Sequence, residues 1–96
     1  RINFNLKTDI MSVEYYKKQI IDIRARIDKE KAAKKRDNEN YANYIKSASS
    51  PSSKASYRKR KIDAAASHDR TIESLKRSLE SAKQSLAREK ERAKKK

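Results

Sequence analysis

The fold is decided by the segment Ser47-Ala48-Ser49-Ser50-Pro51-Ser52-Ser53, which separates two stretches with apolar residues at every third or fourth position. This spacing is typical of α-helices that pack against a partner along one stripe. Two long helices joined by so few residues must return antiparallel. The sequence therefore predicts an all-α fold, an antiparallel two-helix coiled-coil hairpin.

The two predicted helices cover residues 12–49 and 50–96, and together form one helical hairpin. Ser12 is placed to cap the first helix. Ser50 is placed to cap the second, with Pro51 at the first helical position, where a missing N–H costs nothing. The absence of glycine suits long uninterrupted helices.

Residues 1–11 form a separate lead segment. Its apolar residues, among them Ile2, Phe4 and Leu6, alternate with polar ones, which is the period of a β-strand. Because Met11 is followed by a capping serine, it is a candidate natural start. The lead segment is then either a strand, or a vector-derived remnant or upstream-start extension.

A turn centred on Pro51 places apolar residues of one helix opposite apolar residues of the other, for example Ile23 opposite Leu79. The predicted hairpin seam consists of Tyr16, Ile20, Ile23, Ile27, Ile72, Leu75, Leu79 and Leu86. Further along, the first stripe continues through Tyr41, Tyr44 and Ala48.

The middle of the seam is polar. Glu30, Lys34 and Asp37 of the first helix are expected opposite Ala65, His68 and Ile72 of the second. A polar stretch within a seam either fixes the register of the two helices or marks a flexible section. We favour register-setting.

The two flanks of the seam differ in charge. One flank carries cations on both helices, namely Lys17, Arg24, Lys31, Lys76, Lys83 and Lys90. The other is small and uncharged, and we predict self-association there, through Ala64, Thr71, Ser78 and Ser85. The alternative interpretation is that these serines only face solvent and bind no partner. Because a single hairpin covers only half of each stripe, we expect a homo-oligomer in the form of a helical bundle.

The formal net charge of +14 raises nucleic acid as a second partner. The acidic residues are interleaved with the basic ones, however, as in Asp22–Arg26 and Glu30–Lys34, a spacing typical of solvated helices. We therefore expect only weak, nonspecific nucleic-acid binding. Its candidate contacts are Arg58, Lys59, Arg60 and Lys61, for which cation–π stacking on Tyr41 and Tyr44 across the hairpin is a competing role.

No catalytic pattern is visible. His68 is the only histidine and falls on the seam, where a packing role is commoner than catalysis or metal binding. There is no cysteine and no glycine-rich loop. We predict no enzyme activity, no cofactor, no metal and no small-molecule ligand. Without an apolar stretch of membrane-spanning length or a signal-peptide pattern, we expect no membrane association and a cytoplasmic protein.

Three stretches carry a family resemblance. They are the opening Ser12-Val13-Glu14-Tyr15-Tyr16, the serine-rich turn with its basic continuation through Tyr57-Arg58-Lys59-Arg60-Lys61-Ile62, and Ile72-Glu73-Ser74-Leu75-Lys76-Arg77-Ser78-Leu79. With these, the chain from Ser12 onward resembles the N-terminal coiled-coil region of bacterial TIR-domain proteins, effectors of antiphage defence.

The resemblance implies a non-catalytic, self-associating scaffold, the oligomerising arm of a TIR-domain effector. In that family the coiled coil precedes a TIR domain that cleaves NAD. Nothing in this chain matches the TIR sheet or its catalytic glutamate, so no catalytic residue is carried over. The alternatives are a basic nucleic-acid-binding helical module, and a helical-hairpin partner of a type VII secretion effector. The Trp-X-Gly turn of those secretion partners is absent.

Overall fold

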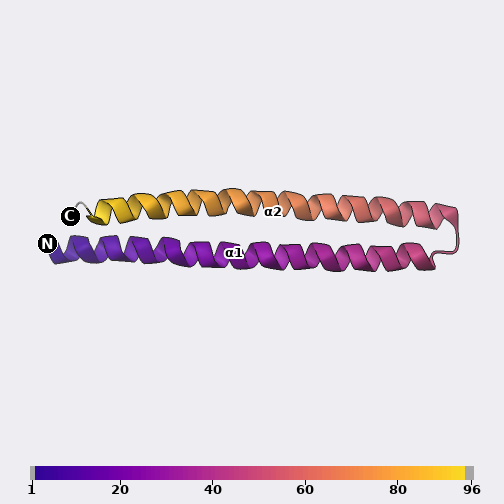
Figure 1. Ribbon diagram of the computed structural model, residues 1–96, viewed down its shortest axis with the longest axis horizontal. Coiled ribbons are helices and arrows are strands. Elements are labelled where there is room, and N and C mark those ends of the chain that lie inside the picture. The colour runs from indigo at the N-terminus through magenta and orange to yellow at the C-terminus, as the bar shows by residue number, and fades with distance from the viewer. Residues whose placement is uncertain (1, 95–96) are drawn as a thin grey trace. The chain divides into compact units, whose positions relative to one another are not determined.

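The computed structural model describes the backbone of residues 2–94 and the side chains of residues 11–94. These residues form two α-helices and no strand: α1 over Ile2–Ser47 and α2 over Pro51–Lys94 (Figure 1). The helices run in opposite directions and are connected by residues 48–50. The prediction of an all-α antiparallel hairpin is confirmed.

The start of α1 differs from the prediction. Because α1 begins at Ile2, the expected strand is wrong for residues 2–11, and Ser12 lies inside the helix instead of capping it. Neither glycine nor proline interrupts this segment, so the helix extends through it. A single strand would also lack a partner for its backbone N–H and C=O groups. The origin of the lead segment as a remnant or an extension stays a prediction.

The start of α2 follows the prediction. The Ser53 N–H donates to Ser50 Oγ at 3.1 Å, and the Ser50 hydroxyl donates to Ser53 Oγ at 2.9 Å. The Lys54 N–H donates to the Ser50 carbonyl at 3.0 Å, which is the first helical hydrogen bond. Ser50 is therefore the N-cap and Pro51 the first helical residue, an arrangement worth about 1 kcal/mol.

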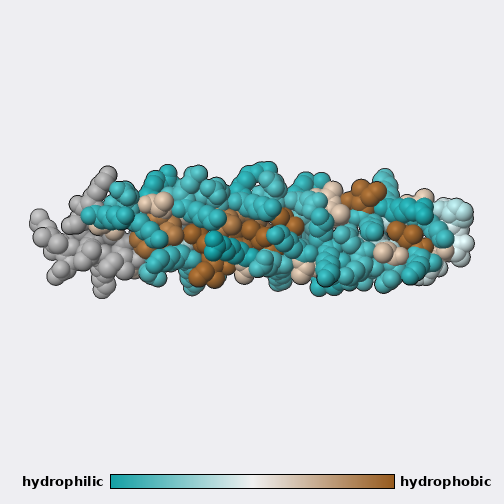
Figure 2. Space-filling view, in the orientation of Figure 1, coloured by the Kyte–Doolittle hydropathy of each residue, from teal (hydrophilic) through white to brown (hydrophobic). Residues whose placement is uncertain are grey.

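The chain divides into two compact units, and each helix passes through both. The first unit comprises Arg1–Arg26 with Leu75–Lys96, and the second comprises Ile27–Ser74. Ile20 and Ala82 are the buried apolar residues described in the first unit, and Ile27 and Ile72 those in the second. Figure 2 shows apolar side chains along the middle of the face in view, with mostly hydrophilic ones on either side of them.

The core is thin. The other predicted seam residues are half-buried: Tyr16, Ile23, Leu75, Leu79 and Leu86. No described side chain is completely buried. The stripe also shifts near the end of α1, where Tyr44 is 51% exposed and Ile45 is half-buried instead. Two helices alone thus leave part of each apolar stripe in contact with solvent.

Candidate functional site

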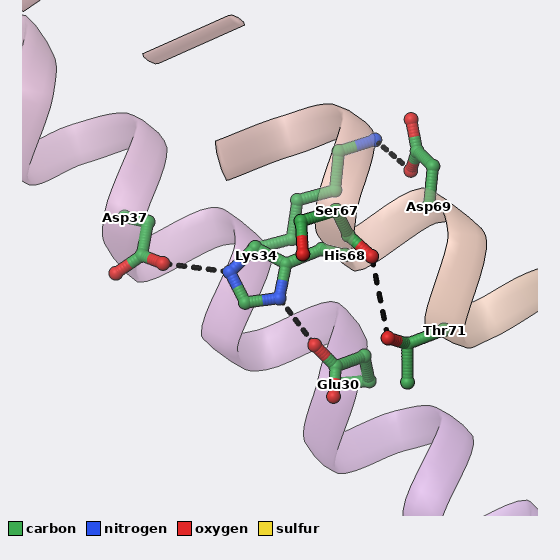
Figure 3. Close-up of polar contacts among 7 residues, drawn as sticks. All are labelled: Glu30, Lys34, Asp37, Ser67, His68, Asp69 and Thr71. Atoms are coloured by element: carbon green, nitrogen blue, oxygen red, sulfur yellow. Dashed lines mark hydrogen bonds and ion pairs between the residues drawn. The ribbon is translucent and has the colours of Figure 1, made fainter. Parts of the chain in front are cut away.

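The most organised polar site lies in the second unit and joins the two helices. Glu30, Lys34 and Asp37 of α1 follow one another at intervals of four and three residues, so they share one face of the helix. The imidazole of His68 extends from α2 toward α1 between the two carboxylates (Figure 3). We call His68, Glu30 and Asp37 the His68 clasp.

Both ring nitrogens of His68 form hydrogen bonds to carboxylates of α1. Nε2 lies 2.6 Å from Asp37 Oδ2, and Nδ1 is hydrogen-bonded to Glu30 Oε2. The His68 side chain is 18% exposed and that of Glu30 is 25% exposed. An ionised carboxylate can only accept hydrogen bonds, so both nitrogens must carry a proton for both bonds to form. The clasp therefore fits the charged imidazolium form of His68.

The electrostatics of the clasp favour the same form. The hydrogen bonds to Asp37 and then to Glu30 raise the pKa of His68 above its usual value, and the charges of the two carboxylates add to this. Partial burial acts in the opposite direction, because it disfavours the charged ring, but it does not cancel the hydrogen bonds. Charge and geometry therefore agree on a protonated histidine.

A second contact between the helices lies beside the clasp. Lys34 Nζ donates to Asp69 Oδ1 at 2.6 Å, and both side chains are partly exposed. The expected pairing of Glu30 with Lys34 along α1 is wrong, since Glu30 bonds to His68 and Lys34 to Asp69. These charges therefore connect α1 to α2 instead of stabilising α1 alone.

This arrangement is structural in character. His68 lies between the helices, where a packing role was expected, and its ring is held there by two hydrogen bonds that the sequence did not indicate. Changing the register by one residue would remove His68 from between its two acceptors, so the clasp supports register-setting as the role of the polar stretch. Among the described residues, no group of three or more metal-ligating side chains is placed to hold an ion.

A groove of about 470 Å³ opens between α1 and α2 in the first unit. The part of α2 that lines it presents mainly small side chains: Ser78, Ser81, Ala82 and Ser85. From α1 it is lined by Tyr16 and Ile23 of the seam and by the charged pair Asp22 and Arg26, among others. We call this the small-residue groove.

The small-residue groove contains two of the four predicted self-association residues, Ser78 and Ser85. The other two belong to the second unit, where Ala64 is half-buried and Thr71 is exposed. The Thr71 hydroxyl donates to the Ser67 carbonyl at 3.2 Å, within α2. Self-association through these four residues stays a prediction.

The basic run lies near the start of α2. Arg58, Lys59 and Arg60 are exposed and Lys61 is half-buried. None of the four forms an ion pair with a described carboxylate. The Arg60 guanidinium lies 5.6 Å from the ring centre of Tyr57, within reach of a cation–π contact.

The cation–π contact therefore involves Tyr57 of the same helix, and not Tyr41 or Tyr44 across the hairpin. Tyr57 instead packs against Tyr44, with their ring centres 5.5 Å apart, and Tyr44 packs edge-on against Tyr41. The aromatic residues near the turn thus hold the two helices together in the second unit, while three of the four basic residues face solvent.

Comparison with known protein families, with curated proteins and with solved structures finds no match to this chain. Across the described residues, neither helix contains a window that is apolar enough and long enough to cross a bilayer.

Proposed function

We propose that this chain is a non-catalytic self-association module, a helical arm that brings attached or bound domains together. The observation that carries the proposal is the small-residue groove, where the seam residues Ile23 and Leu75 are only half-buried. Half-covered apolar seams are stabilised when a second hairpin packs on them.

The resemblance to the coiled-coil region of bacterial TIR-domain proteins supports the same role. An arm of that kind would act in the cytoplasm and bring TIR domains together. Association of helices is the whole activity that we propose for these residues.

We expect the chain to be at least a dimer at micromolar concentration. Replacing Thr71 and Ser78 with lysine should shift it toward monomer, because the new side chains are longer and add charge to a chain already at +14. Molar mass measured by light scattering across a dilution series tests this.

Lys76 provides a matched control, because it lies on the cationic flank between the two substituted positions and is exposed. Exchanging Lys76 for arginine should leave the molar mass unchanged. A wild-type chain that is monomeric throughout the micromolar range would refute the proposed function.

Nucleic-acid binding is the second candidate function, and the exposure of Arg58, Lys59 and Arg60 without carboxylate partners among the described residues favours it. No pattern for reading bases accompanies the run, so binding would depend on phosphate contacts.

We expect weak binding to duplex DNA without sequence preference, which decreases steeply between about 50 and 200 mM salt as counterions are released. Fluorescence anisotropy with two unrelated duplexes measures it. Replacing Arg58 through Lys61 with glutamine should abolish the binding without reducing helicity. Tight binding that survives physiological salt and discriminates between the duplexes would make nucleic-acid recognition the primary function.

A further inference from the structure

The small-residue groove differs in charge from the rest of the chain. Its only charged lining residues are Asp22 and Arg26, so the groove is neutral on a chain with a net charge of +14. The cationic flank of the same unit, by contrast, exposes Lys17, Arg24, Lys76 and Lys83. The groove is therefore the part of this unit where a second copy of the chain meets the least repulsion.

Asp22 and Arg26 are both exposed, and they lie four residues apart on one face of α1. Neither forms an ion pair with any other side chain that the structure describes. Each is thus available to a group outside the chain. An acid and a base separated by one helical turn are complementary to the same pair on an antiparallel copy of the helix.

We propose that the small-residue groove is a two-fold dimer interface, in which Asp22 of each copy pairs with Arg26 of the other. The two-fold axis crosses α1 midway between these residues, so the two α1 helices are antiparallel. The proposal rests on the proposed function of self-association, and it names the surface and the residues that determine the geometry.

A second copy fits the groove better than other partners do. A nucleic acid or an acidic protein would be recognised by a cationic surface, and the groove is neutral. The serines of α2 are short enough to let another helix approach closely, and Tyr16 and Ile23 provide apolar area for it to cover. An isologous contact also closes on itself, so it produces a defined dimer and not a filament.

Charge exchange tests this geometry. In a homodimer, Asp22→Arg alone would place the introduced arginine against Arg26 of the other copy, and Arg26→Asp alone would place the introduced aspartate against Asp22. Each variant should therefore dimerise with a dissociation constant about tenfold higher than wild type, because like charges then meet at both contacts.

An equimolar mixture of the two variants should form heterodimers as readily as wild type forms homodimers. In the heterodimer, one contact joins the introduced arginine to the introduced aspartate, and the other joins Arg26 to Asp22. The double variant Asp22→Arg with Arg26→Asp should also dimerise like wild type.

Matched controls separate pairing from net charge. Asp28→Arg and Arg24→Asp make the same changes in net charge at exposed positions that do not line the groove. They should change the dissociation constant less than about twofold. Sedimentation velocity gives the constants, and native mass spectrometry of tagged chains identifies heterodimers.

The outcomes distinguish this inference from the proposed function. Single variants that dimerise like wild type, or a mixture that forms no excess of heterodimer, would overturn the interface while self-association stands. A monomeric wild type would overturn both. Weakened single variants with restoration in the double variant would support the antiparallel pairing specifically, since parallel helices would place Asp22 against Asp22 in wild type.

Discussion

Replacing Ile72 with alanine is expected to lower the free energy of unfolding by about 2–4 kcal/mol. Ile72 is 8% exposed and is one of four buried apolar residues described in the chain. The substitution removes buried methyl and methylene groups and leaves a cavity that rigid helices fill only in part. Since a hairpin of this size has a stability of only a few kcal/mol, much of the population should unfold.

Ile62 provides the matched control for this substitution. It lies in the same helix and the same unit, but it is 68% exposed. Ile62→Ala should therefore change stability by no more than about 0.5 kcal/mol. Urea unfolding followed by helical circular dichroism, with the wild type and both variants at the same chain concentration, measures both. Equal losses in the two variants would mean that the apolar seam is not the source of stability.

The hairpin itself was predictable from the sequence because two independent signals agreed. The spacing of Ile20, Ile27 and Ile72 indicated the buried stripes, and the Ser50-Pro51 pair indicated where the second helix begins. Both signals are local, since the first depends on helix periodicity and the second on a cap that spans four residues.

The predictions were wrong where a local pattern competes with a longer-range one. The apolar residues Ile2, Phe4 and Leu6 alternate with polar residues at the period of a strand, but this segment is helical. A strand also needs a neighbouring strand for its backbone hydrogen bonds, and the alternation does not indicate one. At Tyr44 and Ile45 the stripe shifts by one residue, which a fixed heptad repeat does not follow.

The His68 clasp was only partly predictable. The sequence placed Glu30 and Asp37 on the seam opposite His68, and their spacing of one heptad was the available signal. It did not show that both would bond to one imidazole, because that depends on the rotation of side chains within a thin, partly hydrated seam. The small-residue groove was also partly predictable, since Ser78 and Ser85 were expected on the small flank. Its volume was not, because it depends on how closely the two helices approach.

The clasp should make the hairpin more stable in acid than in base. The bonds to Asp37 and Glu30 raise the pKa of His68 in the folded state above the unfolded value of about 6.5. A raised pKa means that the folded state holds the proton more tightly. The stabilisation is therefore fully present below about pH 6.5, and it is lost as the pH rises through the folded pKa.

The charged groups around the His68 ring are Lys34, Asp69 and the two clasp carboxylates. The chain has one histidine and no cysteine, and histidine is the side chain whose ordinary pKa lies between about pH 5 and 8. Urea unfolding at about pH 6 and about pH 9 gives the difference in stability, and the ring protons of His68 give its pKa directly by NMR.

Neutral isosteres of its partners test whether the clasp is the cause. With Glu30→Gln and Asp37→Asn, His68 loses both anionic acceptors, so its pKa should fall toward the ordinary value and the pH dependence should disappear. His68→Ala should cost about 1–2 kcal/mol at about pH 6, since two partly exposed charge-assisted bonds are lost, and less at about pH 9. A wild-type hairpin that is equally stable at both pH values, or a His68 pKa unchanged by the two amide substitutions, would show that the carboxylates do not hold the imidazolium. A loss of stability in His68→Ala that is larger at about pH 6 than at about pH 9 would show that the charged imidazolium, bonded from α2 to α1, is the stabilising form.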